Sequence, residues 1–152
     1  MAALAITIQR SARFDEPIMA RVSPANKPCR DCGIDCRIEP DAGVVCAQRR
    51  RRIGEAAAIV AAALGQARPV FSIVDNKRCL QIGVWAWDAE SADLCVVKAI
   101  RHVRTMARHC VNEVQASARA CRSNSTAQKE YDRLQDIVSR SIEALGVELK
   151  YA

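Results

Sequence analysis

Four cysteines in the first third of the chain have a residue type and spacing suited to metal binding. Cys29, Cys32, Cys36 and Cys46 form the pattern C-x2-C-x3-C-x9-C in a stretch rich in proline and glycine. Four thiolates satisfy the tetrahedral preference of Zn²⁺, and metal binding would offset the cost of ordering a loop that has few apolar side chains. The sequence therefore predicts a zinc site, with zinc as the candidate cofactor.

The opening of this cluster, residues 29–33, resembles the turn of a zinc knuckle, because a glycine directly follows the second cysteine. The spacing after Cys32 matches no standard zinc finger or ribbon, and no histidine lies nearby. A catalytic zinc keeps an open position and usually recruits histidine or carboxylate ligands, and only Asp31 and Asp35 are close. We therefore expect any zinc here to be structural.

Three other interpretations of the cluster stay open: unmetallated thiols, an iron–sulfur cluster and a redox-active pair. The spacing departs from both ferredoxin patterns. A thioredoxin-like C-x-x-C lies where a strand meets a helix, whereas Pro28 places this one in a loop. The remaining cysteines lie on predicted strands or helices, where we expect them to pack as small apolar side chains: Cys79, Cys95, Cys110 and Cys121.

Basic residues form two candidate binding surfaces. Four consecutive arginines, Arg49, Arg50, Arg51 and Arg52, suit phosphate contacts or an acidic groove, although they also suit a solvated helix entry. A second set shares one face of a long predicted helix over roughly 30 Å, about one turn of a nucleic-acid duplex. This set consists of Arg101, Arg104, Arg108, Arg119 and Arg122, joined by Asn112 and Gln115. A plain solvent-exposed face is the alternative for this second set.

Alternating apolar residues predict strands at residues 69–74 and 80–87, joined by a turn at residues 75–77. In the second strand this alternation places Trp85 and Trp87 on the face opposite Leu80 and Ile82. If no helix covers that face, the two tryptophans are candidate interface anchors; otherwise they belong to the core. Similar alternation predicts strands at residues 4–8, 18–22 and 147–151.

Helical periodicity predicts three helices. The first begins between residues 41 and 52 and ends near Gly65, with Ile53, Ala56, Ala57, Val60 and Leu64 on its apolar face. The second runs from an N-cap at Asp88 to Arg122, and its apolar seam should pack on the third helix. The third begins at a capping box of Ser125 and Gln128 and ends at Gly146, which completes an antiparallel hairpin at about 88–145.

These elements predict one α+β domain over residues 1–152, in which a small antiparallel sheet packs against three helices. An irregular cysteine-rich loop occupies about 23–46. No window is apolar enough to span a membrane and residues 1–8 lack the pattern of a secretory signal, so we expect a cytoplasmic protein with reduced thiols.

The motifs of common hydrolases, nucleotide-binding proteins and zinc proteases are absent, and the net charge is +6. We therefore expect a non-enzymatic protein that binds nucleic acid, a nucleoprotein complex or an acidic protein surface. In size, charge and its zinc-like loop the chain resembles accessory proteins of phages and mobile elements, including anti-CRISPR inhibitors. Two alternatives are a protein-interaction module, which could form a homodimer through the helical seam and the tryptophan face, and a zinc- or thiol-dependent enzyme or redox sensor.

Overall fold

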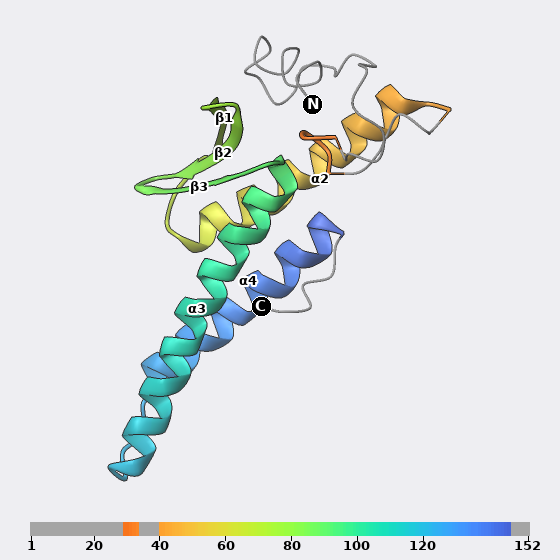
Figure 1. The fold of residues 1–152 in the computed structure, drawn as a ribbon. Helices are drawn as coiled ribbons and strands as arrows, with labels where there is room; N and C mark the ends of the chain where they lie inside the picture. The colour runs from red at the N-terminus through yellow and green to blue at the C-terminus, as the bar shows by residue number, and fades with distance from the viewer. Residues whose placement is uncertain (1–28, 34–39, 147–152) are drawn as a thin grey trace.

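The computed structural model describes residues 29–33 and 40–146, which form a three-stranded antiparallel sheet and three helices (Figure 1). The elements are α2 (Ala42–Ala63), β1 (Val70–Val74), β2 (Lys77–Ile82), β3 (Trp85–Ala89), α3 (Ala92–Arg119) and α4 (Ser125–Leu145). This confirms the predicted sheet, the three helices and the helical hairpin of α3 and α4. The strands predicted at 4–8, 18–22 and 147–151 lie outside the described residues.

The sheet has the order β1-β2-β3 and begins with the predicted hairpin. Val74 pairs with Lys77, so the turn consists of Asp75 and Asn76, whose φ angles are 50° and 62°. Two successive left-handed residues define the turn that best matches the twist of a hairpin, and Asp and Asn tolerate that conformation. The local sequence thus determines this turn.

The single strand predicted over residues 80–87 is wrong, because a second tight turn divides it. Gly83, at a φ of 61°, and the highly exposed Val84 reverse the chain between β2 and β3. Ile82 then pairs with Trp85 and Leu80 with Trp87. Since cross-strand partners point to the same side of a sheet, both tryptophans lie on the face of Leu80 and Ile82 and not opposite them.

The two helices of the hairpin begin at caps other than those predicted. Asp88 belongs to β3, where it pairs with Cys79, so α3 starts after Ser91 and ends at Arg119, before the predicted Arg122. The N-cap of α4 is Asn124, whose side chain accepts a hydrogen bond from the amide of Ala127 at 3.1 Å. Asparagine is as good a cap as serine, and here it stands one residue earlier.

The core lies where the sheet, α2 and α4 meet around the first half of α3. All five residues predicted for the inner face of the first helix are buried. In α3 the buried residues end at Ala107, and none from Arg108 to Arg119 is buried. Figure 1 shows this part of α3 projecting beyond the sheet with the start of α4 beside it. We call residues 108–133 the arm.

Arginines of α2 bind the carboxyl end of α4, and an arginine of α4 binds the carboxyl end of α2. Arg49 donates to the carbonyl of Leu145 at 3.2 Å, and Arg52 donates to that of Ala144 at 3.3 Å. In the other direction, Arg133 donates to the carbonyl of Ala63 at 3.3 Å. The last carbonyls of a helix lack partners within it and carry partial negative charge, so these cations stabilise both helix ends and hold the helices antiparallel.

Substituting Gly146 by alanine should lower the free energy of unfolding by about 1–2 kcal/mol. Gly146 caps α4 at a φ of 74°, and an added Cβ would lie 2.5 Å from the Arg52 guanidinium. Gly54 is the matched control, because nothing lies within 4 Å of its added Cβ. Gly54→Ala should raise stability by about 0.5–1 kcal/mol in chemical denaturation. Equal effects of the two substitutions would contradict this account of the cap.

Candidate metal centre

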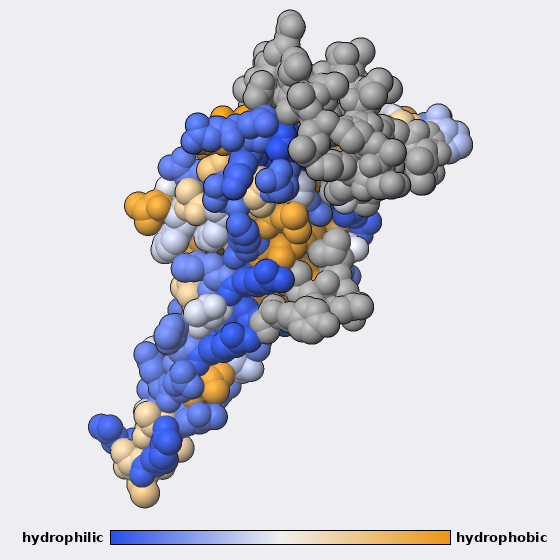
Figure 2. All heavy atoms as spheres, viewed as in Figure 1, coloured by the Kyte–Doolittle hydropathy of each residue, from blue (hydrophilic) through white to orange (hydrophobic). Residues whose placement is uncertain are grey.

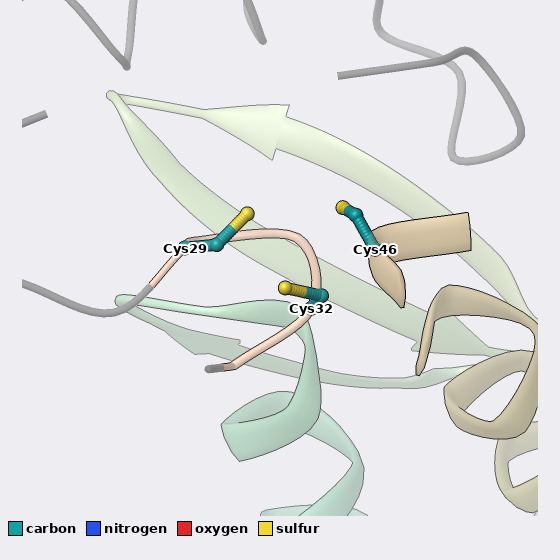
Figure 3. Close-up of side chains that lie close together, drawn as sticks. All are labelled: Cys29, Cys32 and Cys46. Carbon is teal, nitrogen blue, oxygen red and sulfur yellow. The ribbon is translucent and has the colours of Figure 1, made fainter. Parts of the chain in front are cut away.

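Three of the four predicted metal ligands come together in one buried cluster. Cys29 and Cys32 come from the loop at residues 29–33, and Cys46 comes from the start of α2. Their sulfur atoms all lie within 4.8 Å of one another and face a common centre (Figure 3). The exposed fractions are 6%, 0% and 1%. The fourth predicted ligand, Cys36, lies outside the described residues.

The geometry of this thiol cluster fits a metal ion. Zn–S bonds of about 2.3 Å in a tetrahedral centre separate the sulfurs by roughly 3.8 Å, so the observed cluster needs only a small contraction to bind. Thiolates are the ligands that Zn²⁺ and other soft or borderline metals prefer. The cluster could therefore hold a metal ion, and its three cysteines are among the four that the sequence singled out.

Hydrogen bonds within the cluster distinguish the three thiols. The side chains of Cys32 and Cys46 both interact with the sulfur of Cys29 and hold the pKa of Cys29 far below its usual range. Hydrogen bonds of Cys46 with Cys29 and Cys32, together with burial, raise the pKa of Cys46. Of these thiols, Cys29 is therefore the one whose surroundings favour loss of the proton.

A tight turn shapes the loop that carries two of these thiols. The amide of Gly33 donates to the carbonyl of Cys29 at 2.8 Å, and Gly33 has a φ of 79°. A Cβ at this position would overlap the carboxylate of Asp93 in the first turn of α3. Glycine is therefore needed both for the turn and for the close approach of the loop to α3.

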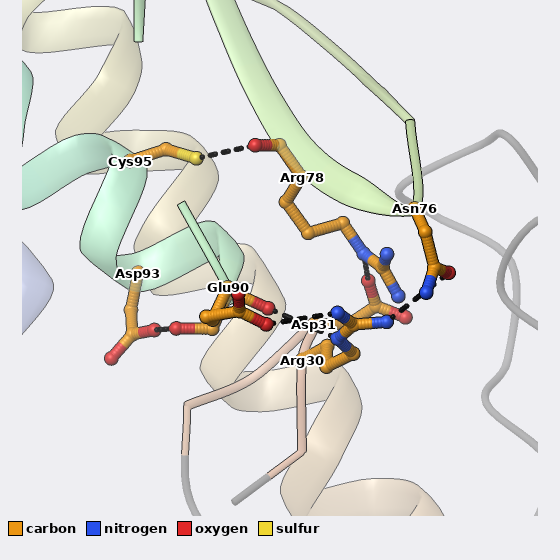
Figure 4. Close-up of polar contacts among 8 residues, drawn as sticks. Arg30, Asp31, Asn76, Arg78, Glu90, Asp93 and Cys95 are labelled. Atoms are coloured by element: carbon orange, nitrogen blue, oxygen red, sulfur yellow. Dashed lines mark hydrogen bonds and ion pairs between the residues drawn. The ribbon is translucent and has the colours of Figure 1, made fainter. Parts of the chain in front are cut away.

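Arg30 attaches this loop to the sheet and to the start of α3 (Figure 4). Its guanidinium lies 2.9 Å from the carboxylate of Glu90 and also donates to the Glu90 carbonyl and, at 3.4 Å, to Asn76. The carbonyl of Arg30 accepts the amide of Ala92 at 2.7 Å, which satisfies one of the unpaired amides of the first turn of α3. The side chain and the backbone of Arg30 are thus both anchored.

Asp31 makes a buried ion pair with Arg78 of β2, with 2.9 Å between Oδ1 and Nε. Both residues are more than nine-tenths buried, and burial raises the pKa of Asp31 although the Arg78 charge opposes this rise. Neither terminal nitrogen of Arg78 has a hydrogen-bond partner among the described residues. Sequence reasoning missed this pair, because its members are 47 residues apart and only the fold brings them together.

The other cysteines differ in their surroundings. Cys95 is buried and donates to the carbonyl of Arg78, and burial raises the pKa of Cys95 to about 12, which keeps it a thiol at neutral pH. Cys79 and Cys110 are half-buried. Cys121 is exposed, so the prediction that it packs in the core is wrong; it lies beyond the end of α3 in a left-handed conformation.

The two tryptophans are half-buried between the sheet and α3. The ring of His102 in α3 lies 5.8 Å from that of Trp85 and 5.7 Å from that of Trp87. The sequence pattern does not link His102 with the tryptophans, because the turn at Gly83 changes the face on which both tryptophans lie. The tryptophan rings thus help to join the sheet to α3.

The structure separates the two sets of basic residues. Of the arginine run, Arg49 and Arg52 cap α4, Arg50 is buried and Arg51 is exposed, so these four side chains do not form one surface. The second set forms a continuous outer face of α3. We call Lys98, Arg101, Arg104, Arg108 and Arg119 the basic face; Arg122 follows just after the helix.

Successive residues of an α-helix are rotated by about 100° around its axis. On this basis, no acidic residue of α3 lies within about 60° of the centre of the basic face. Arg101, Arg108 and Arg119 are exposed, and Arg104 is half-buried. Arg101, Arg104 and Arg119 form no ion pair with the described part of the chain. Figure 2 shows mostly hydrophilic residues on the visible side of the arm. The charges of Arg101, Arg104 and Arg119 are therefore not neutralised by an acidic side chain of the described residues.

None of the described helices is long and apolar enough to cross a membrane. No protein-family model, curated protein or solved structure matches this chain.

Proposed function

We propose that this protein is a non-enzymatic binding protein that applies the basic face of α3 to nucleic acid or a nucleoprotein complex. One observation carries the proposal: the outer face of a 28-residue helix bears five cations and no acid. Because Arg101, Arg104 and Arg119 form no ion pair with the described residues, they keep their attraction for a polyanion. From Lys98 to Arg119 it extends for about 32 Å at 1.5 Å per residue, which is enough to contact several phosphates.

We further propose that the metal is Zn²⁺ and that its role is structural. The thiols of the cluster are almost completely buried, so a bound ion would have little access to a substrate. Holding Cys46 of α2 together with the loop that attaches to α3 would fix these two helices relative to each other. The zinc would thereby support the helix that carries the basic face.

The chemistry of Cys95, the buried cysteine of α3, also favours binding over catalysis. A nucleophilic cysteine needs a lowered pKa and access to its substrate. Cys95 has a raised pKa and donates a hydrogen bond to the backbone carbonyl of Arg78. It therefore supports the interior and offers no reactive thiolate.

Replacing Arg101 and Arg119 with glutamine should weaken binding to duplex DNA and reduce its salt dependence. Removing one cation that pairs with a phosphate lowers the slope of log K against log[salt] by about 0.9, so the double variant should reduce the slope by about 1.8. Fluorescence anisotropy titrations between low and physiological salt measure this slope. The control is Lys129→Gln/Arg140→Gln, which removes the same charge from exposed positions of α4.

The control variant should bind with the slope of the unchanged protein. If both double variants weaken binding equally, net charge and not the basic face determines binding. If the unchanged protein binds no nucleic acid at low salt but retains an acidic protein partner, the nucleic-acid part of the proposal fails.

A further inference from the structure

The arm carries a particular sequence of side chains on the basic face. Arg108, Asn112, Gln115 and Arg119 are all exposed. At about 100° per residue they fall within roughly 60° of one another around α3. Two amide side chains thus lie between two guanidinium groups, over about 17 Å of helix.

In the arm, α4 lies behind α3 with respect to this set of side chains. The half-buried residues Cys110, Val114 and Ser117 mark the side of α3 that faces α4, and Asn124 at the start of α4 donates to Ser117 at 3.2 Å. These positions lie roughly 100–180° around the helix from the four exposed side chains. The sheet contacts α3 through His102, before the arm begins.

A helix exposed in this way fits the major groove of B-form DNA. With side chains an α-helix is about 10–12 Å wide, and the major groove is about 12 Å wide and 8.5 Å deep. The major groove of an RNA duplex is too narrow and deep for side chains to read. The dimensions therefore favour DNA over duplex RNA as the partner of the arm.

We infer that the arm binds in the major groove of double-stranded DNA, with Asn112 and Gln115 contacting base edges and Arg108 and Arg119 contacting phosphates. Asparagine and glutamine amides match the N6 and N7 groups of adenine, so adenine is the expected base. The positive charges of the flanking arginines are complementary to the negative phosphates on either side of the groove. This inference rests on the proposed function and adds base selectivity to it.

Selection of bound duplexes from a randomised DNA library tests the inference. The unchanged protein should enrich sequences with adenine at fixed positions. Asn112→Ala/Gln115→Ala should reduce the preference for a selected duplex over a scrambled one by roughly tenfold or more, without changing the salt slope. Because alanine favours the helical conformation, circular dichroism should show the same helix content in this variant and in its control as in the unchanged protein. The control is Gln128→Ala/Ser139→Ala, which removes exposed uncharged side chains from α4 and should keep the preference.

The possible failures are distinguishable. Equal binding to all duplexes, or stronger binding to single-stranded DNA or duplex RNA, would overturn the inference and leave the proposed function standing. An equal loss of preference in the α4 control would also overturn it. Failure to bind any nucleic acid at low salt would overturn both the inference and the nucleic-acid part of the proposed function.

Discussion

Replacing Cys32 with serine is expected to abolish zinc binding and to lower stability by about 4 kcal/mol, if free zinc is present at a thousandfold excess over its dissociation constant. Cys32 is fully buried and its sulfur lies within 4.8 Å of those of Cys29 and Cys46. The substitution leaves too few thiolates for a tight site and removes the free energy of metal binding from folding. Metal analysis and thermal unfolding with and without a chelator measure both effects.

The control for this prediction is Cys121→Ser. Cys121 is exposed and lies outside the cluster, so this variant should retain its zinc and its stability. A chelator should destabilise the unchanged protein and the Cys121 variant but have no effect on the Cys32 variant. If the unchanged protein contains no zinc after purification in zinc, and a chelator does not alter its unfolding, the metal centre is wrong.

Substituting Asp31 by alanine should lower the free energy of unfolding by about 3–5 kcal/mol. The substitution leaves the charge of Arg78 buried without a counter-ion, since only 4% of its side chain is exposed and its terminal nitrogens have no partner among the described residues. Glu90→Ala is the matched control, because it removes the partner of Arg30 in the same loop. The Glu90 carboxylate is 69% exposed, so this change should cost less than about 1 kcal/mol.

A double variant distinguishes the effect of leaving a buried charge unpaired from the effect of removing the whole ion pair. Asp31→Leu/Arg78→Met replaces the pair with apolar side chains and should recover most of the stability that Asp31→Ala loses. Chemical denaturation with parallel zinc analysis gives the comparison. Equal destabilisation by Asp31→Ala and Glu90→Ala would show that burial does not determine how much the Asp31–Arg78 pair contributes to the free energy of unfolding.

The helices were the most predictable part of the fold, because their apolar periodicity extends over many turns. Val60 of α2, Leu64 at the C-cap of α2, and Leu134 and Val138 of α4 are buried as that pattern requires. Helix ends were less predictable, since they depend on neighbouring structure. Asp88 has the chemistry of a cap but is held in the sheet by its pairing with Cys79.

The tryptophan face was mispredicted for a local reason. Residues 80–87 alternate as one strand would, and the alternation itself does not reveal a turn inside it. Gly83 was the only signal for that turn, and glycine also occurs within strands. One two-residue turn was then enough to move both tryptophans to the opposite face.

Three members of the thiol cluster were predictable from the sequence, but their surroundings were not. Cysteine spacing brings Cys29 and Cys32 together within one turn, which local sequence can predict. The contacts that position this turn, Arg30 with Glu90 and Asp31 with Arg78, join residues 60 and 47 positions apart. Such pairs depend on the completed fold, and no local pattern indicates them.

The arm has a consequence for how this protein can change over generations. Since no residue of α3 from Arg108 to Arg119 is buried, substitutions on its outer face should alter what the protein recognises at little cost to folding. Stability resides instead in the sheet, α2, the first half of α3 and the buried face of α4. A chain organised in this way can acquire a new target while its interior stays the same.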